Sequence, residues 1–224
     1  MYADLYFNET QHFHKCAVPR PQPIDFVLQF FGNQSNLFYI DVGANDGITW
    51  SNSYVLEKYL KWNGICIEPN PEIFTGLVNR RNCKSLNICI SNEDGNVVFR
   101  SVHGYANMLS GILDFFEDAH IQRIDNDIKN HGGYYEDINI RSQPLKNVCQ
   151  ENNVKSIDYL SIDCEGAEYE ILKSLDLEFL QPKLISIETE DNLRPSDNFA
   201  IEYLVKNGYK LERKVCGDSF FSLI

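Results

Sequence analysis

The chain has 224 residues, of which 43% are hydrophobic, 12% aromatic and 23% charged, a composition typical of a globular protein rather than a disordered or fibrous one. Its 20 Lys and Arg residues are outnumbered by 32 Asp and Glu residues, which gives a formal net charge of -12. Because nucleic-acid binding depends on a basic surface, this balance argues against a nucleic-acid partner.

No segment approaches the roughly 18 apolar residues of a membrane span. The N-terminus also lacks the basic start and apolar run of a secretion signal. We therefore expect a soluble, cytoplasmic protein with no membrane partner. The seven cysteines include no CxxC pair and no zinc-module spacing, so reduced, mostly buried thiols are the expected state.

From residue 23 the chain alternates between helix-like and strand-like patterns. The first half predicts a helix over 23–31, a strand over 37–43, a helix over 53–62, a strand over 64–69, a helix from Pro71 capped by Asn70, and a strand over 86–91. The second half predicts a strand over 158–163, a helix over 168–175, a strand over 183–188, a helix over 200–208 and a closing hairpin over 209–224.

This alternation favours a doubly wound α/β fold, with a mostly parallel sheet and helices on both faces. Its rhythm breaks between residues 96 and 150, where 97–102 predicts an extra strand and the rest lacks clean periodicity. We interpret 96–141 as an insertion over the sheet that binds substrate. Residues 1–36 are expected to form a lead-in and a helix, and 37–224 the main domain.

Ligands of open α/β sheets bind beyond the carboxyl ends of the strands, so the residues at those ends are the candidate site. The strand-like runs end in Asp41, Glu68, Ser91, Asp163 and Glu188. Four of these five are acidic, which favours a functional role over chance exposure to water.

The first strand leads into the glycine turn FYIDVGANDGITW (38–50). Gly43 and Gly47 would let backbone N–H groups approach a ligand at a positive helix end. The spacing does not match the GxGxxG pattern, and Asp41 and Asp46 would repel a diphosphate. A ligand that carries an amine, a carboxylate and a ribose therefore suits the turn better than NAD does.

Glu68 ends the second strand, in ICIEPNP (65–71). A carboxylate at that position can accept hydrogen bonds from both hydroxyls of a ribose, and it follows the glycine turn at about the 20-residue interval that βαβ geometry expects. Ser91 ends the third run, and the NEDG that follows it (92–95) would either meet an adenine edge or form a plain turn.

Three segments, FYIDVGANDG, ICIEPNP and YLSIDCEGAEYEIL (159–172), resemble the signature segments of the FkbM family of S-adenosylmethionine-dependent methyltransferases. The resemblance runs from about residue 37 to the end, and SIDCEGAE (161–168) is its most specific part. It implies a class I, Rossmann-like sheet of seven strands with an antiparallel last strand and an insertion between the third and fourth strands. It also implies O-methyl transfer, and it places S-adenosyl-L-methionine on Asp41, Gly43, Asn45 and Gly47, with Glu68 on the ribose.

Methyl transfer to a hydroxyl needs help in removing the alcohol proton. One route is a divalent cation such as Mg or Mn, and Asp163 and Glu188 end consecutive strands with hard oxygen ligands. Metal-dependent catechol-type methyltransferases are similar in this placement. Further oxygen donors close by are Glu165, Glu190, Asp191 and Asn192.

The other route is a general base, for which His103 is the preferred candidate among the insertion histidines His103, His120 and His131. The insertion also supplies aromatic side chains, which stack on the apolar faces of sugars: Tyr105, Phe115, Phe116, Tyr134 and Tyr135. The leading hypothesis is O-methylation of a sugar or glycan hydroxyl, with a divalent metal as an aid. The alternatives are an NAD(P)-dependent oxidoreductase and a non-catalytic nucleoside-binding domain.

Overall fold

The computed structural model describes residues 22–178, 180–189 and 194–224. Its main sheet has seven strands in the order β10-β11-β9-β8-β1-β2-β3. The strands are β1 (Phe38–Val42), β2 (Asn63–Ile67), β3 (Lys84–Leu86), β8 (Tyr159–Ile162), β9 (Leu184–Glu188), β10 (Tyr209–Val215) and β11 (Asp218–Leu223). Strands β1, β2, β3, β8 and β9 pair in parallel, whereas β11 runs antiparallel to β9. The predicted mostly parallel sheet with an antiparallel last strand is confirmed.

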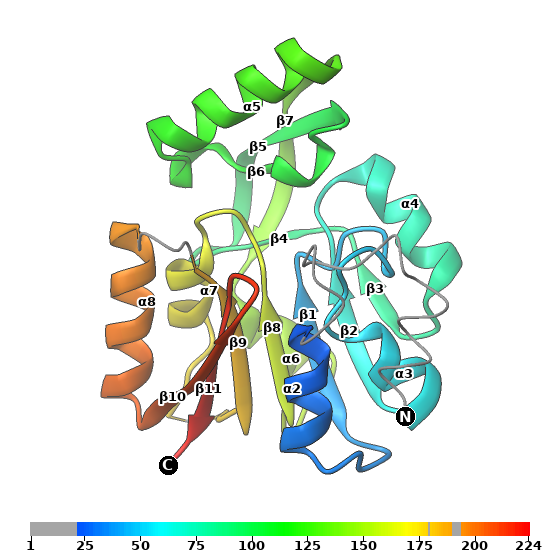
Figure 1. The fold of residues 1–224 in the computed structure, drawn as a ribbon, viewed down its shortest axis with the longest axis vertical. Helices are drawn as coiled ribbons and strands as arrows, with labels where there is room; N and C mark the ends of the chain where they lie inside the picture. The colour runs from blue at the N-terminus through cyan, green and yellow to red at the C-terminus, as the bar shows by residue number, and fades with distance from the viewer. Residues whose placement is uncertain (1–21, 179, 190–193) are drawn as a thin grey trace.

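Helices cover both faces of this sheet (Figure 1). One face carries α2 (Pro23–Phe30), α3 (Tyr54–Leu60) and α4 (Pro71–Arg80), and the other carries α6 (Leu145–Glu151), α7 (Glu168–Ser174) and α8 (Pro195–Lys206). Neighbouring residues of β1 point to opposite faces. Tyr39 therefore packs in the apolar core under α2, α3 and α4, and Ile40 packs in the apolar core under α6, α7 and α8. Each large apolar side chain buried in this way contributes about 1.5–3 kcal/mol.

The insertion forms a second sheet of four strands in the order β4-β7-β5-β6. It comprises β4 (Cys89–Ile90), β5 (Gly95–Gly104), β6 (Gly111–Ile112), β7 (Gly133–Gln143), the short helices η2 (Asn107–Leu109) and η3 (Leu113–Phe115), and α5 (Asp118–His131). Val102 of β5 and Ile124 of α5 are fully buried in one apolar cluster, which fixes the helix on the sheet. Figure 1 shows these elements in teal to yellow-green, beyond the edge at which β1 and β8 end.

The structure differs from the predicted third strand, which is divided between the two sheets. Lys84–Leu86 pairs with β2 in the main sheet, whereas Cys89–Ile90 pairs with β7 in the second. Between them the side-chain amide of Asn87 donates to the carbonyl oxygens of Glu68 and Pro69, at 2.8 Å each. These bonds hold the chain at the end of β2, so Ser91 follows a strand of the second sheet.

Among the described residues five cysteines are free thiols, and three of these, Cys66, Cys89 and Cys149, are buried, as expected. Cys216 is disulfide-bonded, so the expectation of reduced thiols is wrong for this residue. The lead-in expected over 1–36 is described only from Gln22 onward. Within the described ranges, no helix has both the length and the apolar character needed to cross a membrane.

Candidate functional site

A cavity lies at the carboxyl edge of the main sheet, beneath the insertion. Four of its lining residues are the acidic residues predicted from the ends of the strands: Asp41, Glu68, Asp163 and Glu188. The insertion supplies the opposite wall, which includes Phe99, Asn107, Met108, Ser110, Ile112 and Arg123. The cavity therefore joins the predicted cofactor turn, the predicted carboxylates and the predicted substrate insertion in one space.

The glycine turn after β1 is held close to its neighbours by backbone hydrogen bonds. The N–H groups of Gly43 and Ala44 both donate to the carbonyl oxygen of Ile67, at 3.0 Å each. Gly43 has a φ of +82°, and a Cβ built on it would collide with the carbonyl oxygen of Asp163. Only glycine permits this approach of β1 to the end of β8.

Glu68 connects the turn to the end of β2. One carboxylate oxygen accepts a hydrogen bond of 2.9 Å from the N–H of Asn45, and the other accepts one of 2.8 Å from the N–H of Asn70. Glu68 is 6% exposed, and its burial raises the pKa to about 7. A carboxylate has about four acceptor positions, so two of them remain for a ligand in the cavity.

Asp41 is held from the opposite side of the turn. It is 4% exposed and accepts a hydrogen bond from the hydroxyl of Ser53, which precedes α3. Burial raises its pKa above the ordinary value of an aspartate. The buried carboxylate lines the cavity, where it is suited to receive a cationic group such as an ammonium.

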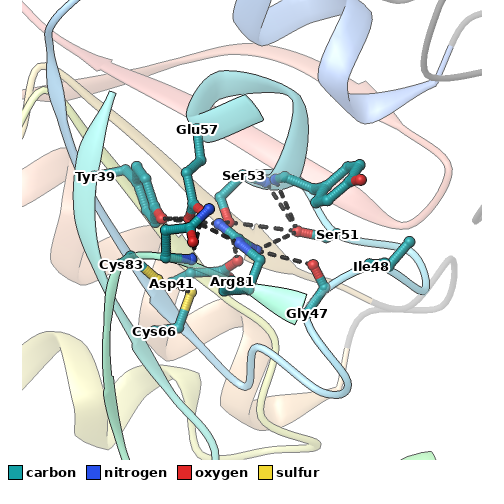
Figure 2. Close-up of polar contacts among 12 residues, drawn as sticks. Tyr39, Asp41, Gly47, Ile48, Ser51, Ser53, Glu57, Cys66, Arg81 and Cys83 are labelled. Atoms are coloured by element: carbon teal, nitrogen blue, oxygen red, sulfur yellow. Dashed lines mark hydrogen bonds and ion pairs between the residues drawn. The ribbon is translucent and has the colours of Figure 1, made fainter. Parts of the chain in front are cut away.

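Arg81 organises the loop between the glycine turn and α3, as Figure 2 shows. Its guanidinium donates to the carbonyl oxygen of Gly47 at 3.0 Å, to the Ser53 hydroxyl at 3.0 Å and to the Tyr39 hydroxyl at 2.8 Å. It also pairs with the carboxylate of Glu57 at 2.9 Å. Arg81, which is 5% exposed, is not among the residues predicted from the sequence.

A second set of acidic residues, which we name the acidic group, lies after β8 and β9. Carboxylate oxygens of Asp163, Glu165 and Glu188 lie within 4.8 Å of one another. Glu165 has a φ of +53°, a backbone conformation that is uncommon outside glycine and asparagine. Burial and the charge of Asp163 raise its pKa to about 8. These three carboxylates could hold a divalent cation, and Glu190, Asp191 and Asn192 lie outside the described residues.

The turn that presents Glu165 is stabilised from within the SIDCEGAE segment. Both carboxylate oxygens of Glu168 are engaged, by the N–H of Cys164 at 2.9 Å and by the N–H of Gly166 at 3.0 Å. From the insertion, His120 places its Nδ1 3.4 Å from the Glu165 carboxylate and its Nε2 3.0 Å from the carbonyl oxygen of Leu109. The insertion therefore contacts the acidic group directly.

Three of the predicted site residues lie outside the lining of the cavity in the described part of the chain: Gly47, Ser91 and His103. Ser91 pairs with the hydroxyl of Ser142 at 2.6 Å in the second sheet. His103 lies 2.7 Å from the carboxylate of Glu72 and stacks on the ring of Tyr134, with ring centroids 4.4 Å apart. Its contacts join the insertion to α4 and do not bring the imidazole to the acidic group.

Comparison with known proteins identifies the family. The sequence signature described as "Methyltransferase FkbM domain" matches residues 41–211, which is more than half of the chain. No curated protein sequence is significantly similar to it. This family assignment replaces the NAD(P)-dependent oxidoreductase that the βαβ start left open.

One solved structure supports the fold, and two others are more distantly similar. The methyltransferase FkbM of Methylobacillus flagellatus KT superposes with a TM-score of 0.52 at 14% identity, over 85% of this chain and 44% of that one. This chain therefore spans less than half the length of that protein. Precorrin-6y C5,15-methyltransferase of Geobacter metallireducens GS-15 gives a TM-score of 0.45 at 13% identity, over 88% and 84% of the two chains. The fibrillarin of Aeropyrum pernix gives 0.46 at 11% identity, over 86% and 68%.

The family signature covers residues 41–211, a range that includes the glycine turn, the end of β2 and the SIDCEGAE segment. The chain belongs to the FkbM family of methyltransferases, and its fold is that of the class I S-adenosylmethionine-dependent enzymes.

Proposed function

We propose that this protein transfers the methyl group of S-adenosylmethionine to a hydroxyl of a sugar or glycan, with a divalent cation at the acidic group. One observation carries the proposal: Glu68, the glycine turn and the carboxylates of Asp163, Glu165 and Glu188 all line a single cavity. S-adenosylmethionine, when bound, supplies a methyl group on a positively charged sulfur.

The residues around the turn fit this cofactor. Glu68 presents a buried carboxylate with two acceptor positions still available, which suits the two hydroxyls of a ribose. Asp41 offers a buried negative charge to the ammonium of the amino-acid part. Gly43 and Asn45 line the same wall, so we assign them to cofactor contact. Gly47 lies outside the cavity lining, and its carbonyl oxygen accepts a hydrogen bond from Arg81, so we assign it a role in the shape of the turn. We do not assign Ser91 to cofactor contact.

The acidic group fits Mg or Mn. Three carboxylates within 4.8 Å of one another repel each other, and they supply the hard oxygen ligands that these cations prefer. A cation there would lower the pKa of an acceptor hydroxyl. We leave His103 out of the catalytic set, because its ring faces Glu72 and Tyr134 rather than the cavity.

The wall contributed by the insertion supports a sugar acceptor. Phe99, Met108 and Ile112 offer apolar surface, and Ser110 and Arg123 add polar groups beside it. Sugars present apolar C–H faces and hydroxyl edges, which match such a mixture. The five aromatic residues named from the sequence lie outside this lining in the described ranges, so the support comes from Phe99 in their place.

The test is a transfer assay with S-adenosylmethionine labelled on its methyl group. Monosaccharides and oligosaccharides are compared with phenols and amines, each with added Mg or Mn and with a chelator. The proposal predicts label on a sugar oxygen, located by mass spectrometry, only when the cation is present. Label confined to phenols or amines would contradict the sugar acceptor, and transfer that ignores the chelator would contradict the cation.

A further inference from the structure

Two cysteines lie side by side near Arg81, the residue that supports the glycine turn. Cys66 is in β2 and Cys83 directly precedes β3, and their Sγ atoms are 3.4 Å apart. Figure 2 shows both sulfur atoms next to Arg81 and Tyr39. A disulfide has an S–S distance of about 2.05 Å, so a movement of little more than an ångström would join the two sulfurs.

The surroundings give the two thiols different roles. The pKa of Cys83 is lowered by its hydrogen bond with Cys66 and by the positive charge of Arg81. The pKa of Cys66 is raised by the same hydrogen bond and by burial. Cys66 is 0% exposed, whereas Cys83 is only partly buried. Cys83 is therefore the thiol that solvent reaches and that forms a thiolate more easily. The buried thiol of Cys66 lies in contact with it.

Two other free cysteines of the described residues, Cys89 and Cys149, lack this combination. Burial raises the pKa of both Cys89 and Cys149 to about 12. The thiolate is the form that reacts with oxidants, so these two thiols are expected to be inert near neutral pH. The reactive pair is thus distinguished by its geometry, by the neighbouring guanidinium and by the partial exposure of Cys83.

We propose that Cys66 and Cys83 form a redox-sensitive pair that a peroxide converts into a disulfide. The Cys83 thiolate attacks a peroxide oxygen, the O–O bond breaks, and hydroxide leaves to give a sulfenic acid. The sulfur of Cys66 then attacks the Cys83 sulfur, the S–O bond breaks, and water leaves as the disulfide forms. Two thiols and one hydrogen peroxide give one disulfide and two waters.

The experiment uses the full chain and hydrogen peroxide near equimolar amounts. Remaining thiols are then alkylated, and the protein is digested with trypsin without reductant. The two cysteines fall in the separate tryptic peptides 62–80 and 82–84. The proposal predicts that these two peptides become linked, and that dithiothreitol separates them again. Oxidation of Cys83 to sulfinic acid without a link, or a preferred link between other cysteines, would overturn it.

Conservative variants check the two roles. Cys83→Ser should leave Cys66 reduced, and Cys66→Ser should leave a sulfenic acid on Cys83 that dimedone labels. Cys149→Ser is the matched control and should form the Cys66–Cys83 link as efficiently as the original chain. Circular dichroism confirms folding of each variant, and the result on the unchanged chain decides the proposal even where a variant fails to fold.

Discussion

The N–H of Asn45 donates a hydrogen bond of 2.9 Å to the carboxylate of Glu68, so the turn after β1 and the end of β2 form one unit. The two residues are 23 positions apart, and they meet because β1 and β2 pair in parallel with Val42 opposite Ile67. The carboxylate that we assign to the cofactor ribose therefore also fixes the shape of the turn. Loss of the charge at this position should affect both.

Glu68→Gln should weaken the binding of S-adenosylhomocysteine, the demethylated product. Hydrogen bonds to a charged group contribute about 1.5–3 kcal/mol, which corresponds to a loss of about 10- to 150-fold in affinity. Calorimetric titration measures it. Glu202→Gln replaces an exposed carboxylate on α8 and is the control that should leave the affinity unchanged. Equal affinities of the Glu68 variant and the original chain would remove Glu68 from the cofactor site.

The affinity for S-adenosylhomocysteine should rise with pH through about 7. Burial raises the pKa of Glu68 to about 7, so below that pH the carboxyl is protonated in the ligand-free protein. Ribose hydroxyls donate to the ionised form, so binding is favoured above that pH and weakens as the pH falls. The contribution of Glu68 to the free energy of unfolding has the opposite pH dependence. It is fully present below the pKa that this carboxyl has in the unfolded chain, and it is lost as the pH rises through about 7, the pKa in the folded protein. Titrations between pH 6 and 8 check the first trend, and a pH-independent affinity of the unchanged chain would contradict it.

Arg81→Gln should destabilise the fold strongly. The substitution removes a buried cation that pairs with Glu57 and bonds to Gly47 and Tyr39, and breaking a buried pair costs about 3–5 kcal/mol. Urea unfolding measures the free energy of unfolding. Arg80→Gln is a matched control one residue away, since Arg80 is exposed and its pair with Asp46 lies at the surface; it should cost about 1 kcal/mol or less. Similar losses for both variants would contradict the central position given to Arg81.

The sequence predicts part of the candidate site. The strand ends were predictable, because hydrophobic runs give the strands and parallel strands bring their carboxyl ends to one edge. Arg81 was not, because its partners Gly47, Ser53 and Glu57 lie 24 to 34 positions away on separate elements. No local pattern marks such a convergence.

The helix of the insertion was also not predictable from the sequence. Ile121, Ile124 and Ile128 follow helical spacing within α5, yet the polar residues between them conceal the short apolar stripe. The position of Ser91 was not predictable either, because the apolar run before it is divided between two sheets at Asn87. Short runs of this kind carry no information on which sheet they join.

Removal of divalent cations should abolish methyl transfer and leave cofactor binding intact. We assign the carboxylates of Asp163, Glu165 and Glu188 to the cation rather than to the cofactor, so Asp163→Asn and Glu188→Gln should lower kcat rather than the affinity for S-adenosylhomocysteine. Rescue of a chelated sample by Mg or Mn, measured in the labelled-methyl assay, checks this. Full activity in excess chelator would be the contrary outcome.

His103→Gln tests the alternative route to removing the proton. Loss of a general base lowers the rate by about 10²- to 10⁴-fold. Because the imidazole contacts Glu72 outside the cavity, we expect kcat to change by less than about tenfold. A larger loss with the fold intact would return His103 to the catalytic set.

The most direct test of the account is the titration of the full chain with S-adenosylhomocysteine, because it requires no knowledge of the acceptor. We expect one site with a Kd near the micromolar range, which corresponds to about -8 kcal/mol. We also expect weaker binding in the Glu68→Gln variant. No binding by the folded protein at millimolar ligand would contradict the assignment of this cavity to S-adenosylmethionine.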